Sequence, residues 1–114
     1  MELQEIVTLC EKALDDMKAE DILVVDVMGK SSMSDILIFA TGTSTRHVKS
    51  LAHSVNADVK NAGLEPFGME GVNEGQWALV DIGDIVVHIM LPDVREFYQL
   101  ERLWQGDSEE ATEA

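Results

Sequence analysis

The chain has 114 residues, which is the size of one domain with one hydrophobic core. Eight Lys and Arg face 22 Asp and Glu, so the formal net charge is −14 at pH 7. Nucleic-acid affinity comes largely from Lys and Arg that neutralise phosphates, so this charge disfavours direct RNA or DNA binding as the main mode. It favours a basic protein partner, or else it only keeps the protein soluble.

The sequence also bears on compartment. No apolar run reaches the length of a membrane span, and the N-terminus lacks the basic start and apolar block of a secretory signal. The single cysteine, Cys10, cannot form an internal disulfide and fits a reducing compartment. We therefore expect a cytoplasmic protein without a membrane-bound part.

The first half of the chain predicts the order α-β-β-α. Apolar residues at helical spacing predict an amphipathic helix over about residues 2–19. Strands are expected over Asp21 to Val27 and Ile36 to Thr41. Gly42 to Thr45 break the second strand and offer N-caps, and a second helix follows that stops at Gly63. Its apolar stripe is Val48, Leu51, Ala52, Val55, Val59 and Ala62.

A β-hairpin is the clearest signal in the second half. Trp77 to Ile82 and Ile85 to Met90 are two apolar runs joined by the two-residue turn Gly83-Asp84. Pairing Ile82 with Ile85 produces one aliphatic face, because side chains alternate along a strand. The opposite face carries Trp77, Leu79, Asp81, Val86, His88 and Met90. That mixture indicates a surface that binds something rather than one that only faces water.

The remaining elements complete the fold prediction. Pro66 to Gly71 predicts a short edge strand, and Pro92 opens a last helix over about Asp93 to Gln105. The inner arc of that helix is expected to be Phe97, Leu100 and Trp104, with Tyr98 nearer its rim. We expect one α/β (α+β) domain over residues 1–106, with a mixed sheet of about five strands in the order α-β-β-α-β-β-β-α, and an acidic, disordered tail over 107–114.

Two arrangements could suggest catalysis. Gly29-Lys30-Ser31 resembles the end of a phosphate-binding loop, but Val24 stands where that motif needs glycine, and a strand follows instead of a helix. A tight polar turn is the favoured interpretation. Cys10 lies on the apolar stripe of the first helix, which indicates a core residue rather than a nucleophile.

The carboxylates do not form a convincing site either. Asp26, Asp35, Asp81 and Asp84 are scattered, whereas metal catalysis needs carboxylates that converge. A contact between His88 and Asp81 is conceivable, but one His and one Asp do not make a metal site. We therefore expect no catalytic residue, no metal site and no cofactor.

Two other groups of residues point to binding. Trp77 and Tyr98 are candidate anchors, because aromatic side chains dominate binding hot spots. The alternative is that Trp77 packs beneath the last helix. The second helix carries the main cationic patch, which is either a solvated face or a minor docking surface: Arg46, His47, Lys49, His53 and Lys60.

An ordered set of motifs carries a family resemblance. The set is Gly29-Lys30-Ser31-Ser32, Ser34-Asp35, Gly42 to Val48, Glu70-Gly71, Trp77, Asp81 to His88, Tyr98, Leu100-Glu101 and Leu103-Trp104. Together they resemble the bacterial ribosomal silencing factor family, also called the Iojap or YbeB family, over about residues 3–105. No single motif is specific, but their order and spacing are. Ser34, where many members have Thr, is the one visible departure.

The resemblance implies a fold and a function. The fold would be a small mixed-sheet domain related to nucleotidyltransferases but without their catalytic carboxylate pair. The function would be to bind the large ribosomal subunit through ribosomal protein uL14 and so block joining with the small subunit, which represses translation when nutrients are scarce. By matching positions, the contact residues would be Glu70, Trp77, Leu79, Asp81, His88, Met90 and Tyr98.

Two alternatives remain from the sequence. One is a small Mg²⁺-dependent, nucleotidyltransferase-like enzyme that uses Asp26, Asp81 or Asp84. The other is that the mixed face of the hairpin forms a homodimer in the free state, since an apolar surface suits self-association as well as a partner. Contacts of Arg46 and Lys49 with ribosomal RNA would be secondary.

Overall fold

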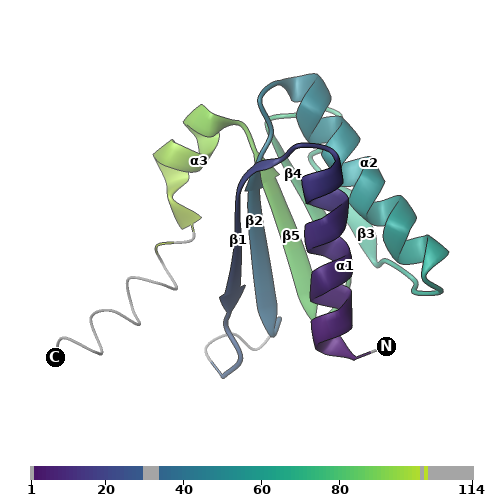
Figure 1. The fold of residues 1–114 in the computed structure, drawn as a ribbon. Coiled ribbons are helices and arrows are strands. Elements are labelled where there is room, and N and C mark those ends of the chain that lie inside the picture. Colours follow the sequence, from purple (N-terminus) through teal and green to yellow (C-terminus); the bar gives the residue numbers. More distant parts are fainter. Residues whose placement is uncertain (1, 30–33, 101, 103–114) are drawn as a thin grey trace, which may run out of the picture.

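The computed structural model describes residues 2–29, 34–100 and 102. Its elements follow the expected order: α1 (Leu3–Asp16), β1 (Glu20–Asp26), β2 (Ile36–Thr41), α2 (Thr45–Asn61), β3 (Gly68–Glu70), β4 (Trp77–Asp81), β5 (Ile85–Met90) and α3 (Pro92–Tyr98). They form a single small α+β domain, as expected from the sequence (Figure 1). The acidic tail and Trp104 lie outside the described residues.

The five strands form one mixed sheet in the order β1-β2-β5-β4-β3. The central pair, β2 and β5, is parallel, and the other neighbours are antiparallel. The hairpin has the expected register, with Ala78 opposite Ile89, Leu79 opposite His88 and Val80 opposite Val87. β3 is the short edge strand that the sequence predicts.

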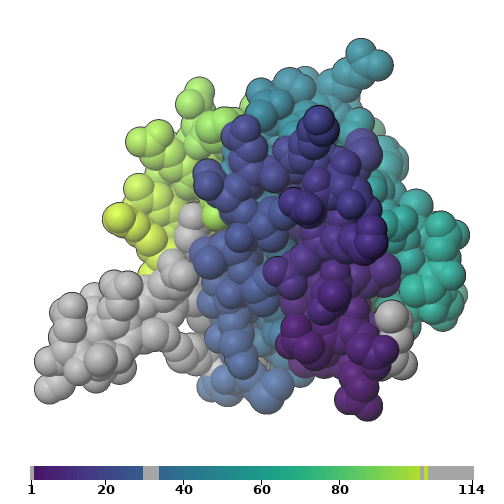
Figure 2. Space-filling model, in the orientation of Figure 1, coloured from purple at the N-terminus to yellow at the C-terminus, as the bar shows by residue number. Residues whose placement is uncertain are grey.

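Helices α1 and α2 cover one face of the sheet (Figure 1). In Figure 2, α1 (purple) lies between β1 (blue) and α2 (teal) on the visible face of the molecule. The apolar stripes of both helices pack onto the aliphatic face of the hairpin, where Ala78, Val80 and Ile89 are fully buried. Cys10 is buried in this core, and burial raises the pKa of its thiol to about 12, so it is a packing residue as expected.

Helix α2 begins and ends at residues that favour helix termini, and it is linked to α1. Ser44 is the N-cap of α2, and its hydroxyl accepts a hydrogen bond from the backbone N–H of His47. Gly63 follows the helix with φ of +90°, a conformation that favours glycine. His47 also links the helices, since its Nδ1 accepts from the Thr43 N–H and its Nε2 lies 2.7 Å from the Met17 carbonyl oxygen.

The last helix is interrupted where the sequence predicts one continuous element. α3 ends at Tyr98, because Gln99 adopts a left-handed conformation with φ of +47°. Leu100 and Arg102 beyond this break are again helical, and residues 101 and 103–105 lie outside the described residues. Helix α3 packs on the sheet face opposite α1 and α2, where Val94 and Leu100 contact a second small core. The buried members of this second core are Val25, Val27, Leu37, Phe39 and Met90.

Candidate interaction surface

The candidate site is the face of the hairpin that α1 and α2 do not cover. Trp77, Leu79 and Asp81 project from β4, and His88 lies directly across from Leu79 on β5. All four side chains are half-buried. The alternation of β4 therefore produces the mixed aromatic, apolar and acidic surface that the sequence predicts.

A hydrogen bond fixes the indole of Trp77. Its Nε1–H donates to Nδ1 of His88 over 3.1 Å, and the imidazole stacks on the ring of Phe39, with centroids 5.2 Å apart. Because an indole N–H only donates, Nδ1 must be unprotonated. Burial lowers the pKa of His88 to about 4, so the imidazole is neutral at physiological pH. The contact considered between His88 and Asp81 is replaced by this bond.

Tyr98 covers the outer side of Trp77. The two rings are 5.1 Å apart, and Phe97 packs edge-on against Tyr98 at 4.9 Å. Trp77 therefore lies beneath α3 and still keeps part of its surface, which answers the question that the sequence left open. Phe97 was expected on the inner arc of the helix, but it is 75% exposed. The ring of Phe97 packs against Tyr98 and otherwise faces solvent rather than the sheet.

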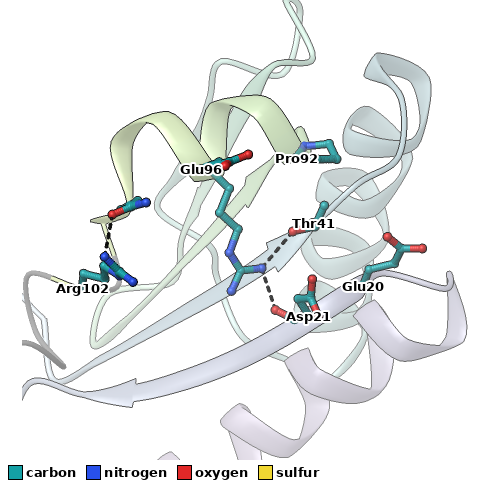
Figure 3. A pocket seen from close by; sticks show the side chains of 8 residues that line it. Glu20, Asp21, Thr41, Pro92, Glu96 and Arg102 are labelled. Atoms are coloured by element: carbon teal, nitrogen blue, oxygen red, sulfur yellow. Dashed lines mark hydrogen bonds between the residues drawn. The ribbon is translucent and has the colours of Figure 1, made fainter.

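Arg95 connects α3 to the sheet through hydrogen bonds. Arg95 Nη1 donates to the backbone oxygen of Asp21 at 2.6 Å and to the buried hydroxyl of Thr41 at 2.9 Å (Figure 3). These acceptors belong to β1 and β2, so one guanidinium connects three elements. It lies in a hollow of about 300 Å³, which Glu20 and Glu96 also line. The contact sets the position of Tyr98 over Trp77.

The acidic part of the surface lies at the β3 edge. Glu70 is exposed on β3 and pairs in register with Leu79, and Asp81 accepts a hydrogen bond from the Gly83 N–H at 2.9 Å. Beside them, Phe67 is 77% exposed. The sequence analysis placed Phe67 inside the expected edge strand but did not single it out, because no alternation of apolar and polar residues there indicates where its side chain points.

Met90 requires a correction. The sequence analysis placed it among the contact residues, but it is fully buried in the second core together with Phe39. α3 follows directly after β5 and folds back over that end of the sheet, which removes Met90 from the surface. Met90 therefore lies beside Trp77 on the neighbouring strand, in the core against which Trp77 packs, and offers no area of its own to a partner.

Two of the carboxylates considered for catalysis have local backbone partners. Asp26 accepts a hydrogen bond from the Met28 N–H, and Asp81 caps the hairpin turn. In residues 2–29, 34–100 and 102, no group of three His, Cys, Asp or Glu side chains is placed to hold a metal ion. Nor does a described helix have the length and apolar character needed to cross a bilayer.

The fold and the site define a small α+β domain that presents an aromatic surface with an acidic edge. Residues 1–114 match the family described as "Ribosomal silencing factor during starvation", and the chain belongs to this family. A Chromobacterium violaceum protein named "Ribosomal silencing factor RsfS" is 49% identical over 106 residues, which cover 93% of this chain and 87% of that protein.

A solved structure and a eukaryotic relative extend this result. A crystal structure of a Chromobacterium violaceum protein superimposes with a TM-score of 0.91 at 48% identity, covering 92% of this chain and 88% of that one. A Mus musculus protein named "Mitochondrial assembly of ribosomal large subunit protein 1" is 37% identical over 89 residues, which cover 75% of this chain and 39% of that protein. The family resemblance inferred from the motifs is confirmed.

Proposed function

We propose that this protein represses translation by binding the large ribosomal subunit through ribosomal protein uL14 and sterically blocking association with the small subunit. Membership of the ribosomal silencing factor family supports a role on the ribosome. The name of the mouse relative refers to the large subunit of that protein's own ribosome, which supports the choice of subunit. The site of action is then the cytoplasm, and the condition is nutrient limitation.

One observation carries the proposal: the aromatic pair of Trp77 and Tyr98 lies at one end of β4, and the half-buried carboxylate of Asp81 and the exposed one of Glu70 lie towards its other end. Aromatic side chains supply desolvated contact area, and carboxylates attract Lys and Arg. With a net charge of −14, such a surface favours a basic protein over ribosomal RNA. Leu79 and His88 complete the contact surface.

Inhibition of this kind requires no turnover. A bound protein that occupies the joining surface excludes the small subunit by its volume, so the protein acts without a cofactor and not as an enzyme. The Mg²⁺-dependent enzyme, which would use Asp26, Asp81 or Asp84, gains no support, because the described residues contain no group of three His, Cys, Asp or Glu placed to hold a metal ion. Any contact of Arg46 or Lys49 with ribosomal RNA is secondary, because α2 packs on the opposite face of the sheet from the hairpin surface.

Cosedimentation with purified large subunits tests the proposal. Trp77→Ala is expected to weaken binding by about 2 kcal/mol or more, since it removes a central aromatic anchor. Asp81→Lys is expected to weaken binding by reversing a charge at the contact. Gln4→Ala, at an exposed position on α1, is the matched control and should bind as the wild type does.

The variants must stay folded for this comparison, because Trp77 also packs beneath α3. Trp77→Phe retains an aromatic ring there and should recover part of the binding. Unchanged cosedimentation of both Trp77→Ala and Asp81→Lys would remove this surface from the proposal. Light scattering of the free protein shows whether it forms a homodimer. If the dimer uses the same face, binding to large subunits should weaken as the protein concentration rises.

A further inference from the structure

A second hollow lies at the end of β4 that is farther from α3. It has a volume of about 240 Å³ and is lined by the segment from Phe67 to Glu70 together with Leu79 and Asp81. One wall is the ring of Phe67, which is 77% exposed. The exposed ring therefore forms an apolar wall next to the carboxylates of Glu70 and Asp81.

The walls of this hollow are fixed by the sheet. The Phe67 N–H donates to the Asp81 carbonyl oxygen at 2.8 Å, which holds the residue before β3 against β4. Gly83 lies beside the Phe67 ring, since a Cβ added there would be 3.4 Å from its Cε1 atom. Oδ1 of Asp81 accepts from the Gly83 N–H, and the described residues place no donor on its other oxygen. The hollow therefore exists before any partner arrives.

We propose that this hollow takes the side chain of a lysine or arginine from the protein partner. Such a side chain has an apolar stem that can lie on Leu79 and a cationic end that can face the Phe67 ring and the carboxylates of Glu70 and Asp81. A phosphate would be repelled by both carboxylates, and a wholly apolar side chain would desolvate them without compensation. The net charge of −14 attracts the same class of partner.

This proposal rests on the proposed function and implies that the partner binds in one orientation. Trp77 and Asp81 lie four residues apart on β4, a separation of about 13 Å along a strand. The contact surface then has two unlike ends, an aromatic end at Trp77 and a cation-binding end at Phe67. A partner surface must present an apolar group and a basic group at about that spacing, which is more selective than apolar area alone.

The test measures affinity for purified large ribosomal subunits at low and high salt. Glu70→Gln and Asp81→Asn, which retain shape and hydrogen-bonding oxygens, are each expected to weaken binding by about three- to tenfold at low salt. Their deficit should shrink at high salt, because screening removes the same attraction from the wild type. Phe67→Leu retains apolar area but loses the aromatic face, and should weaken binding about threefold.

Asp15→Asn is the matched control, because it removes one exposed negative charge from α1, across the sheet from the hollow. If it weakens binding as much as Glu70→Gln, the attraction is diffuse and the hollow has no special role. If Trp77→Ala weakens binding while all three hollow variants match the wild type, this inference fails and the proposed function stands. If the wild type does not bind large subunits, both fail.

Discussion

At the scale of single residues, the burial of His88 makes the free energy of unfolding depend on pH. His88 has a folded-state pKa of about 4, below its ordinary value of 6.5, so the unfolded chain binds more protons between these values. The contribution is therefore complete above pH 6.5 and is lost as pH falls towards 4. Protonation would also remove Nδ1 as the acceptor for the indole N–H.

Urea unfolding of the wild type and of His88→Gln at several pH values tests the predicted loss of stability at low pH. The stability advantage of the wild type should fall by about 1 kcal/mol between pH 6.5 and 5.5. Subtracting the variant cancels the titration of the carboxylates, which both proteins share. A difference that stays constant with pH would show that His88 is not buried in its neutral form.

Gly71 is a second residue with a definite consequence. Its φ is +72°, and a Cβ at this position would collide with the carbonyl oxygen of Trp77. Gly71→Ala is expected to lower the free energy of unfolding by about 2 kcal/mol or more, from backbone strain plus the collision. Gly63→Ala is the matched control, since φ is +90° but the added Cβ meets nothing within 4 Å. Denaturant melts that rank the two variants equally would contradict the collision.

At the scale of elements, α3 depends on Arg95. The helix has seven residues, none fully buried, so its own packing holds it weakly. Arg95→Met retains an apolar stem but removes the donors to Asp21 and Thr41, and should loosen α3 at a cost of about 1–3 kcal/mol. The measurement is the NMR signal of the Trp77 indole N–H, together with hydrogen exchange of the α3 amides.

Arg102→Met serves as the control for that experiment, because Arg102 bonds only locally to Gln99 among the described residues. It should leave the indole signal in place. If Arg95→Met also leaves the signal and the exchange rates unchanged, the apolar contacts of Val94 and Leu100 are sufficient to dock the helix.

The same elements show how far sequence reasoning reached. The hairpin register was predictable, because strict alternation and a two-residue turn leave one pairing that buries the aliphatic face. The end of α3 was not, because Gln99 adopts the left-handed conformation without the glycine that usually marks it. The exposure of Phe97 and the burial of Met90 were not predictable either, because both depend on how α3 folds back over the sheet. Phe67 lies outside any periodic pattern, so only the structure revealed it.

At the scale of the whole molecule, the two faces of the sheet differ in how far helices cover them. α1 and α2 build the main core on one face, and the other face keeps Trp77, Leu79 and Asp81 partly open. This division predicts that contact variants lose binding without losing the fold. Under the proposed function, the wild type should slow the rise in light scattering when separated subunits are mixed. Trp77→Ala at the same concentration should not, and an equal effect of both proteins would contradict a contact through this face.

The parallel pair at the centre of the sheet has a consequence for how the protein is made. β2 must pair with β5, although Ile36 and its partner Ile85 are 49 positions apart in the sequence. Such distant pairing is slow and cannot begin until both partners exist. A nascent chain therefore has no closed sheet, and no completed surface around Trp77, until β5 and α3 have been synthesised. Under the proposed function, the product cannot act on the ribosome that makes it before that ribosome has passed these elements.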